Sequence, residues 1–199
     1  MALLFLLFLM AVVIHEVSHG VMANFLGDPT ARDAGRLTLN PLRHIDPFGT
    51  ILLPLFLHLI HSPFVFGWAK PVPINHMNLR NPKSDMLWIG AAGPASNFLL
   101  AGAAASLIKV AGPGLPPVAA GLLRYVALVN LVLGCFNLVP VPPLDGSRVL
   151  VGLLPVRWAK RVLSLERWGI LILMGLLYFG VIDRFLWPAV SWLSQRLGL

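Results

Sequence analysis

The sequence predicts an all-α protein that crosses a membrane several times, and two observations support this fold class. Of its 199 residues, 57% are hydrophobic and only 12% are charged, and the mean hydropathy is +0.81. A soluble fold of this size cannot bury that much apolar surface. Several apolar stretches approach or exceed the ~20 residues that a spanning helix needs. We therefore expect about four to six membrane segments in one membrane-embedded domain over 1–199, with a core at 1–150 and C-terminal helices at 165–199.

The first predicted helix covers residues 2–26. It is apolar on both sides of a polar HEVSHG motif and stops at Gly27-Asp28-Pro29. The first residues resemble the apolar core of a signal peptide, but they have no basic start and no small-residue cleavage site before the motif. We expect the segment to persist as a helix in the mature protein.

The chain between this helix and the next long one is predicted to turn back within the membrane. After a polar stretch at 28–47, the apolar run at 50–61 has only about 12 residues, which suits a re-entrant or interfacial segment better than a full crossing. The sequence FVFGWAKPVPIN at 64–75 is rich in Val, Pro and aromatic residues, which is typical of extended chain. We expect a re-entrant or β-like hairpin near residues 50–75, and we expect the membrane segments together to surround a buried site.

Two further long apolar segments, 85–108 and 118–139, are separated by a Gly/Pro-rich turn. The second of them ends in the sequence FNLVPVPPLDG. Residues 147–167 are then predicted to form a basic connector. An apolar segment at 168–182 leads to a Trp-rich tail at 185–197, which fits the membrane interface.

The positions of Lys and Arg predict the orientation of the chain. If residues 28–84 stay on one side, with the hairpin dipping in and returning, that side carries eleven of the fifteen cations. Cytoplasmic loops hold the excess of Lys and Arg, so this side is predicted to be cytoplasmic. It also receives the C-terminal ends of the first helix and of the 118–139 helix. The net charge of +7 does not favour nucleic acid as a partner, because the cations are scattered through short loops.

The most informative motif is HExxH, formed by His15-Glu16-Val17-Ser18-His19. Four residues turn a helix through about 400°, so the two imidazoles lie about 40° apart and one turn displaced, where they can bind one metal ion. Zinc accepts imidazole nitrogens, and its catalytic sites keep one position open for water. Glu16 is rotated about 100° from His15, so it can approach that water without binding the metal.

Chance and burial both favour a functional motif. From the numbers of His and Glu in the chain, roughly 0.002 matches to HExxH are expected at random. Ionisable groups inside a membrane helix are costly and indicate function by default. The alternative is a pair of histidines that only bond neighbouring backbone or water.

A third protein ligand is needed, and Asp145 is the candidate. It follows a Pro-rich break after the 118–139 segment, and the cation count places it at the same membrane face as HExxH. Gly146 permits close approach of the backbone. A helix cap or a solvated loop charge is the alternative for a lone Asp at a helix end.

Three segments, taken in order, resemble the signatures of a known family. HEVSHG, GPASN at 93–97 and NLVPVPPLDG at 137–146 look like those of the site-2 proteases, the intramembrane zinc metalloproteases of peptidase family M50. FGWAKPVPIN resembles a segment of the family's small bacterial members, and the chain looks like such a member without a PDZ domain. The resemblance implies one Zn²⁺ held by His15, His19 and Asp145, with Glu16 as general base and acid.

The same resemblance implies roles in substrate binding. Asn97 and Asn137 would steady the oxyanion or an extended substrate backbone, because their amides can donate to a developing negative charge. A hydrogen bond that only packs helices is the alternative for both residues. The 66–75 segment would pair with an unwound substrate by edge addition.

These observations predict a zinc metalloendopeptidase that hydrolyses peptide bonds of membrane-spanning substrates by a zinc-bound water that Glu16 activates, in regulated intramembrane proteolysis. Its expected partners are single-pass membrane proteins and the lipid bilayer, and a homo-oligomer is left open. Its expected location is the bacterial cell membrane, with the active site toward the cytoplasm.

Two other classes of protein compete with this prediction. A zinc transporter would need a second polar metal motif on a neighbouring helix, and a non-catalytic membrane scaffold would need no metal. His58 and His61 share a helical face, but they end a short apolar run where interfacial polarity is ordinary. We do not expect a second metal there.

Overall fold

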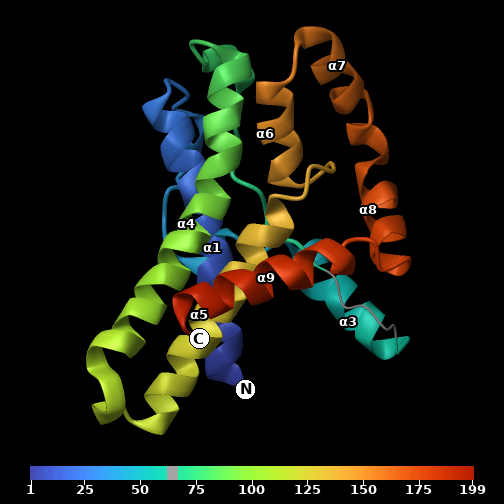
Figure 1. The fold of residues 1–199 in the computed structure, drawn as a ribbon. Coiled ribbons are helices and arrows are strands. Elements are labelled where there is room, and N and C mark those ends of the chain that lie inside the picture. The colour runs from blue at the N-terminus through green and yellow to red at the C-terminus, as the bar shows by residue number, and fades with distance from the viewer. Residues whose placement is uncertain (62–66) are drawn as a thin grey trace.

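The computed structural model describes residues 1–61 and 67–199, and all the regular secondary structure in these ranges is helical (Figure 1). Three of the described helices are long and apolar enough to cross a membrane: α1 (Ala2–Phe25), α4 (Pro82–Ala111) and α5 (Pro117–Asn137). The three helices pack against one another. The predicted all-α membrane fold is thereby confirmed.

Short elements fill the chain between α1 and α4. They are α2 (Thr30–Asp33), η1 (Pro41–Arg43), the π-helix η2 (Pro47–Leu52), α3 (Leu53–Leu59) and η3 (His76–Asn78). The π-helix runs directly into α3, so the apolar run at 50–61 is helical and too short to span.

Residues 67–75 have no regular secondary structure, so the described part of the predicted hairpin contains no strand. Pro71 and Pro73 lack the N–H groups that a sheet ladder requires, which explains why this stretch does not pair as a strand. The other part of the hairpin, residues 62–66, lies outside the described ranges.

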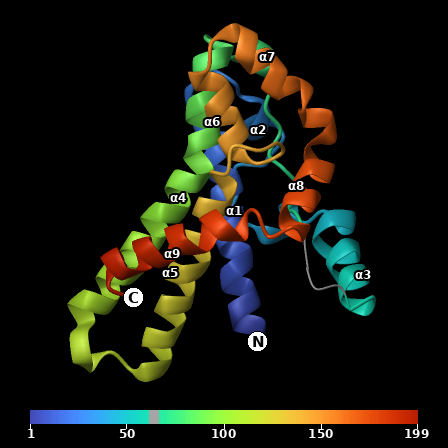
Figure 2. The same ribbon diagram turned by 45° about the vertical axis from the view of Figure 1, so that its right-hand side comes forward.

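The C-terminal third contains α6 (Asp145–Leu153), α7 (Val156–Ser164), the short turn η5 (Glu166–Trp168), α8 (Gly169–Tyr178) and α9 (Asp183–Leu197). Another short turn, η4 (Gly112–Gly114), connects α4 to α5. Helix α6 packs along α4, and α9 crosses over α5 (Figure 2). The α7–α8 segment and α9 are bent by 76° and would make a fourth span if counted together. The predicted connector at 147–167 is thus largely helical, with its cations Arg157, Lys160 and Arg161 on exposed faces.

Glycines allow α4 to lie close to α6. A Cβ at Gly90 would meet the Cβ of Arg148 at 2.9 Å and the backbone oxygen of Asp145 at 3.2 Å. A Cβ at Gly152 would meet the side chain of Leu87 at 2.5 Å. Close packing of small residues is a main source of helix association in membranes. These contacts bring the start of α6 against the middle of α4.

Asp28 ties the loop after α1 to η3. Its fully buried carboxylate accepts hydrogen bonds from the N–H of Thr30 at 3.1 Å, the N–H of Asn75 at 2.6 Å and the side-chain amide of Asn78 at 2.9 Å. Burial acts to raise the pKa of Asp28, but these donors and the Thr30 hydroxyl outweigh it, so the pKa is lowered. The charged form is therefore the one that stabilises the fold.

Asp28→Asn should lower the free energy of unfolding by about 1–3 kcal/mol at neutral pH. The substitution replaces one carboxylate oxygen by an NH₂ group, so the backbone or side-chain N–H groups that bond this oxygen lose their acceptor. A lowered pKa means that the stabilisation is complete above the unfolded value of about 3.9 and is lost as the pH falls below it. The difference between wild type and variant, measured by denaturant unfolding in detergent, should shrink below about pH 4.

Asp33→Asn is the matched control, because Asp33 forms only an exposed ion pair with Arg32 and such pairs contribute little. Equal losses in the two variants would contradict the role assigned to Asp28.

Candidate metal centre

The ligand candidates from α1 and α6 converge at one point. The Nε2 atoms of His15 and His19 lie 3.1 Å apart, and they lie 3.0 and 3.1 Å from Oδ2 of Asp145. All three side chains are buried. Within the described ranges, they form the one group of three or more His, Cys, Asp or Glu side chains that is placed to hold a metal ion.

Hydrogen bonds decide which nitrogen of each imidazole faces this point. Nδ1 of His19 lies 2.6 Å from the backbone oxygen of Ile89, and Nδ1 of His15 lies 2.6 Å from Oδ1 of Asn97. Both oxygens can only accept, so both Nδ1 atoms carry the ring proton. Each neutral ring then directs an unprotonated Nε2 toward the Asp145 carboxylate. Three acceptors at such distances repel one another unless a cation or proton lies between them.

The geometry fits a zinc ion. Tetrahedral ligands at about 2.0–2.1 Å from zinc are separated from one another by about 3.3 Å. The triangle of His15, His19 and Asp145, with sides of 3.0–3.1 Å, is one slightly contracted face of such a tetrahedron. Two imidazoles whose other nitrogens donate to oxygens, together with one carboxylate, are a usual donor set for catalytic zinc. The fourth position is left for water or substrate.

Two neighbours shape this site. Gly93 of α4 faces both imidazoles, and a Cβ there would lie against their Nε2 atoms. Arg148, one turn after Asp145 on α6, donates from Nη1 to Oδ1 of Asp145 at 3.2 Å. The other carboxylate oxygen, Oδ2, is thereby left to face the histidines.

Glu16 lies next to His15 on α1 and faces the irregular segment 67–75. Its Oε2 accepts a hydrogen bond from the N–H of Val72 at 3.1 Å. Because the residues on both sides of Val72 are prolines, Val72 has the only backbone N–H between Lys70 and Ile74. The carboxylate is therefore attached to a single backbone donor.

The loop after α1 holds the segment 67–75 in place. Nη2 of the buried Arg36 donates to the carbonyl oxygen of Lys70 at 2.8 Å, and the Lys70 N–H donates to the carbonyl oxygen of His44 at 2.9 Å. These bonds fix the backbone just before Val72. The position of the predicted general base thus depends on a segment that begins 42 residues after the end of α1.

The two predicted substrate-binding asparagines lie in different surroundings. Asn97 is fully buried on α4, where its Oδ1 accepts from His15 and its Nδ2 donates to Oδ1 of Asn130 at 2.8 Å. Asn137 is half-buried at the end of α5, and its Nδ2 donates to the carbonyl oxygen of Leu133 at 3.0 Å. The structure brings Asn97 to the histidines, whereas the Asn137 amide bonds its own helix. Oxyanion or substrate contact by either residue stays a prediction.

Arg148 and Asn130 also contact the site, although neither is among the site residues predicted from the sequence. Arg148 enters the prediction only as one of the cations that set the topology, yet an Arg three residues after an Asp on a helix is a signal for an ion pair. Asn130 lies inside an apolar run, and the cost of a polar side chain in a membrane helix is a signal that it has a partner.

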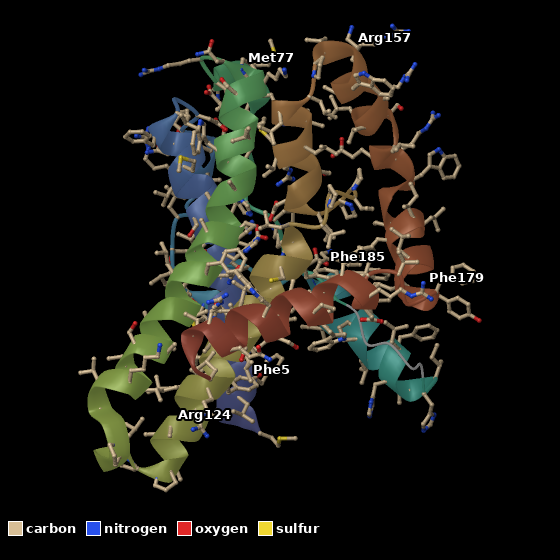
Figure 3. All side chains as sticks on the ribbon, in the orientation of Figure 1. Phe5, Met77, Arg124, Arg157, Phe179 and Phe185 are labelled. Carbon is tan, nitrogen blue, oxygen red and sulfur yellow. The ribbon has the colours of Figure 1, made fainter. Side chains whose placement is uncertain are left out.

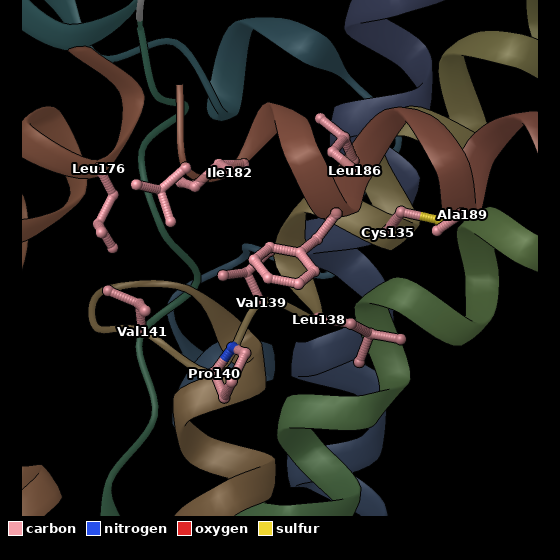
Figure 4. A pocket seen from close by; sticks show the side chains of 11 residues that line it. Cys135, Leu138, Val139, Pro140, Val141, Leu176, Ile182, Leu186 and Ala189 are labelled. Atoms are coloured by element: carbon pink, nitrogen blue, oxygen red, sulfur yellow. The ribbon is translucent and has the colours of Figure 1, made fainter. Parts of the chain in front are cut away.

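Two cavities lie near the ends of these helices. One, of about 440 Å³, has nearly apolar walls formed by the end of α5, the chain at 138–141, α8 and α9, and includes Cys135 and Phe185 (Figure 4). The other, of about 410 Å³, lies between α4, α6 and α7 and includes Ser147, Arg148, Lys83 and Lys160. The second cavity is the more polar of the two, and it includes Arg148, the arginine that contacts Asp145.

Comparison with known proteins gives consistent matches. The model of peptidase family M50 matches residues 116–179. "Putative zinc metalloprotease YwhC" of Bacillus subtilis is 36% identical over 184 residues, which are 89% of this chain and 80% of the relative. "Putative zinc metalloprotease Rip2" of Mycolicibacterium smegmatis is 26% identical over 191 residues, 96% of this chain and 72% of the relative. "Zinc metalloprotease MJ0392" of Methanocaldococcus jannaschii is 28% identical over 160 residues, 79% of this chain and 36% of the relative. No solved structure matches.

Gly93→Ala should weaken zinc binding by about tenfold or more, because the added methyl group displaces the two Nε2 atoms. The measurement is competition with a chromogenic chelator in detergent. Gly102→Ala is the matched control, since Gly102 lies on the same helix with nothing within 4 Å of its Cβ position. Zinc affinity that is unchanged in Gly93→Ala would contradict the site.

Proposed function

The chain belongs to peptidase family M50 and is a zinc metalloprotease, and from this premise we propose that it cuts peptide bonds within membrane-spanning substrates. The observation that supports this proposal is the position of the HExxH motif. His15 and His19 lie on α1, a helix long and apolar enough to span, and both are buried. A proteolytic site enclosed by such helices would be reached most directly by a substrate that is itself in the bilayer.

We further propose that Nε2 of His15, Nε2 of His19 and Oδ2 of Asp145 hold one Zn²⁺. When bound, zinc lowers the pKa of a water molecule to about 7 and polarises a carbonyl group. The transporter alternative has no second metal cluster to support it among residues 1–61 and 67–199. A scaffold without metal would leave the convergence of three acceptors without a function.

Glu16 is proposed to carry the proton. Its carboxylate takes a proton from the attacking water, whose oxygen forms a bond to the scissile carbonyl carbon. When the carbon–nitrogen bond breaks, Glu16 returns that proton to the departing amine nitrogen. The hydrogen bond from Val72 holds the carboxylate in one orientation between these two transfers.

The substrate must present an unwound backbone, because a helix hides its carbonyl groups in internal hydrogen bonds. The segment 67–75 is the proposed place for this unwound backbone. This segment already runs past Glu16 through Val72, and its prolines prevent it from pairing completely with the protein's own chain. An unwound substrate lying along 67–75 would bring its scissile bond near the general base.

The orientation in the membrane is proposed from the distribution of cations on this integral membrane protein. Figure 3 shows Met77 and Arg157 at one end of the helices and Arg124 toward the other. The exposed side chains of Arg157, Lys160 and Arg161 make the first end the more basic one, and in a bacterial membrane that end would face the cytoplasm. Water would enter through the polar cavity between α4, α6 and α7.

Glu16→Gln should lower the rate of substrate cleavage by about 10²–10⁴-fold while one zinc remains bound per chain, because the amide cannot accept the proton. The assay is cleavage of single-pass reporter proteins in proteoliposomes, with zinc measured by elemental analysis. Asp33→Asn makes the same chemical change at an exposed carboxylate and should cleave normally. Wild-type cleavage by Glu16→Gln would refute the assigned role.

Cleavage is expected in the half of the substrate segment nearer the cytoplasm. Mass spectrometry of products from reporters with a known orientation locates the cut. Cuts concentrated in the opposite half would show that the proposed orientation is wrong.

A further inference from the structure

We propose that Asn130 is a positioning residue that acts through Asn97 to set the tautomer of His15. This inference rests on the proposed function, because it takes His15 as a zinc ligand. It assigns a role to a residue of α5 whose hydrogen bonds are to Asn97 and to the backbone of its own helix. The three side chains belong to three different helices, α5, α4 and α1.

The first contact fixes the amide of Asn130. Its Nδ2 donates to the backbone oxygen of Val126, four residues earlier on α5, at 2.9 Å. A carbonyl oxygen can only accept, so the NH₂ group of Asn130 must lie on this side. Its Oδ1 therefore faces α4, and the side chain is only 2% exposed, so water cannot readily take either place.

The second contact passes this orientation to Asn97. Nδ2 of Asn97 donates to Oδ1 of Asn130 at 2.8 Å. Because Oδ1 of Asn130 can only accept, Asn97 must turn its NH₂ group toward α5 and its own Oδ1 toward α1. That Oδ1 lies 2.6 Å from Nδ1 of His15. Both ends of the Asn97 amide are thus assigned by their partners.

The third contact decides the position of the ring proton. A neutral imidazole has one N–H, and the Asn97 oxygen requires it on Nδ1. Nε2 of His15 is then a free electron pair, 3.0 Å from Oδ2 of Asp145. If the Asn97 amide were turned over, its NH₂ group would face Nδ1, and the ring proton would move to Nε2 and block metal binding. Asn97 alone does not choose between these two orientations, but Asn130 does.

The second histidine does not depend on this chain of hydrogen bonds. Nδ1 of His19 donates to the backbone oxygen of Ile89 at 2.6 Å, and a backbone carbonyl cannot turn over. The two proposed imidazole ligands are therefore set in different ways. Changes at Asn130 should act on His15 and leave His19 in its tautomer.

The test is Asn130→Leu in two backgrounds, wild type and Asn97→Asp, with zinc affinity measured on the purified full chain by chelator competition. In the wild-type background we expect a loss of about 10–100-fold. In the Asn97→Asp background either carboxylate oxygen can accept from His15, so Asn130→Leu should change zinc affinity by less than about twofold. Equal losses in both backgrounds would mean that Asn130 only packs α5 against α4, and would overturn the proposal.

A second variant, Asn130→Ser, tests the proposal even if Asn130→Leu does not fold. Asn130→Ser keeps a hydroxyl that can bond the Val126 oxygen but is too short to reach Asn97, and the same loss of affinity is expected. In the metal-free protein, at a pH high enough for the His15 ring to be neutral, the ¹⁵N chemical shifts of that ring should show the proton on Nδ1 in wild type and partly on Nε2 in Asn130→Ser. A proton that stays wholly on Nδ1 in this variant would also overturn the proposal.

His15→Ala separates this inference from the proposed function. Zinc affinity that is unchanged in His15→Ala would refute the proposed ligand set. If His15→Ala loses zinc while Asn130→Leu and Asn130→Ser keep wild-type affinity, the ligand set stands and the role of Asn130 is refuted.

Discussion

The structure depends on holding three electron-pair donors against one another inside a bundle of apolar helices. His15, His19 and Asp145 have no favourable contact to make with each other unless a cation or a proton lies between them, and burial removes the water that would otherwise separate them. Three features of the surrounding chain allow this convergence. Gly93 leaves the space, the glycines between α4 and α6 allow the approach, and Arg148 occupies the second carboxylate oxygen.

The loop after α1 fixes the position of the irregular segment 67–75. Residues 67–75 cannot rely on a helix or a sheet, so individual side chains bind their backbone. Asp28 holds one end and Arg36 holds the middle. This arrangement uses buried charged groups in place of regular hydrogen bonding, and it leaves one N–H, that of Val72, to contact Glu16. The loop is therefore part of the architecture around the proposed active site, although it contains no proposed ligand.

The sequence predicts the parts of this molecule that follow from local spacing. The three long apolar helices and the pairing of His15 with His19 depend on periodicity and length, and these are readable from a single chain. The prediction that Asp145 joins the two histidines also depends on the topology inferred from the positions of the cations. The role of Asn130 depends on which amide faces which helix, and no periodicity encodes that. The short helices α6 and α7 are not evident from the sequence because their cations resemble those of a loop. The two prolines at 71 and 73 exclude the strand that the Val and aromatic residues of 64–75 favour.

The two halves of the proposed metal site come from distant parts of the chain, since 130 residues separate His15 from Asp145. At ordinary rates of synthesis, a ribosome needs on the order of ten seconds to cover that distance. During this interval the first helix is already made, with its histidines and glutamate, while the carboxylate that completes the set has not been translated. With the ligand set proposed above, a nascent chain lacks this carboxylate until α6 has emerged, so proteolytic activity would begin only after α6 has packed against α4.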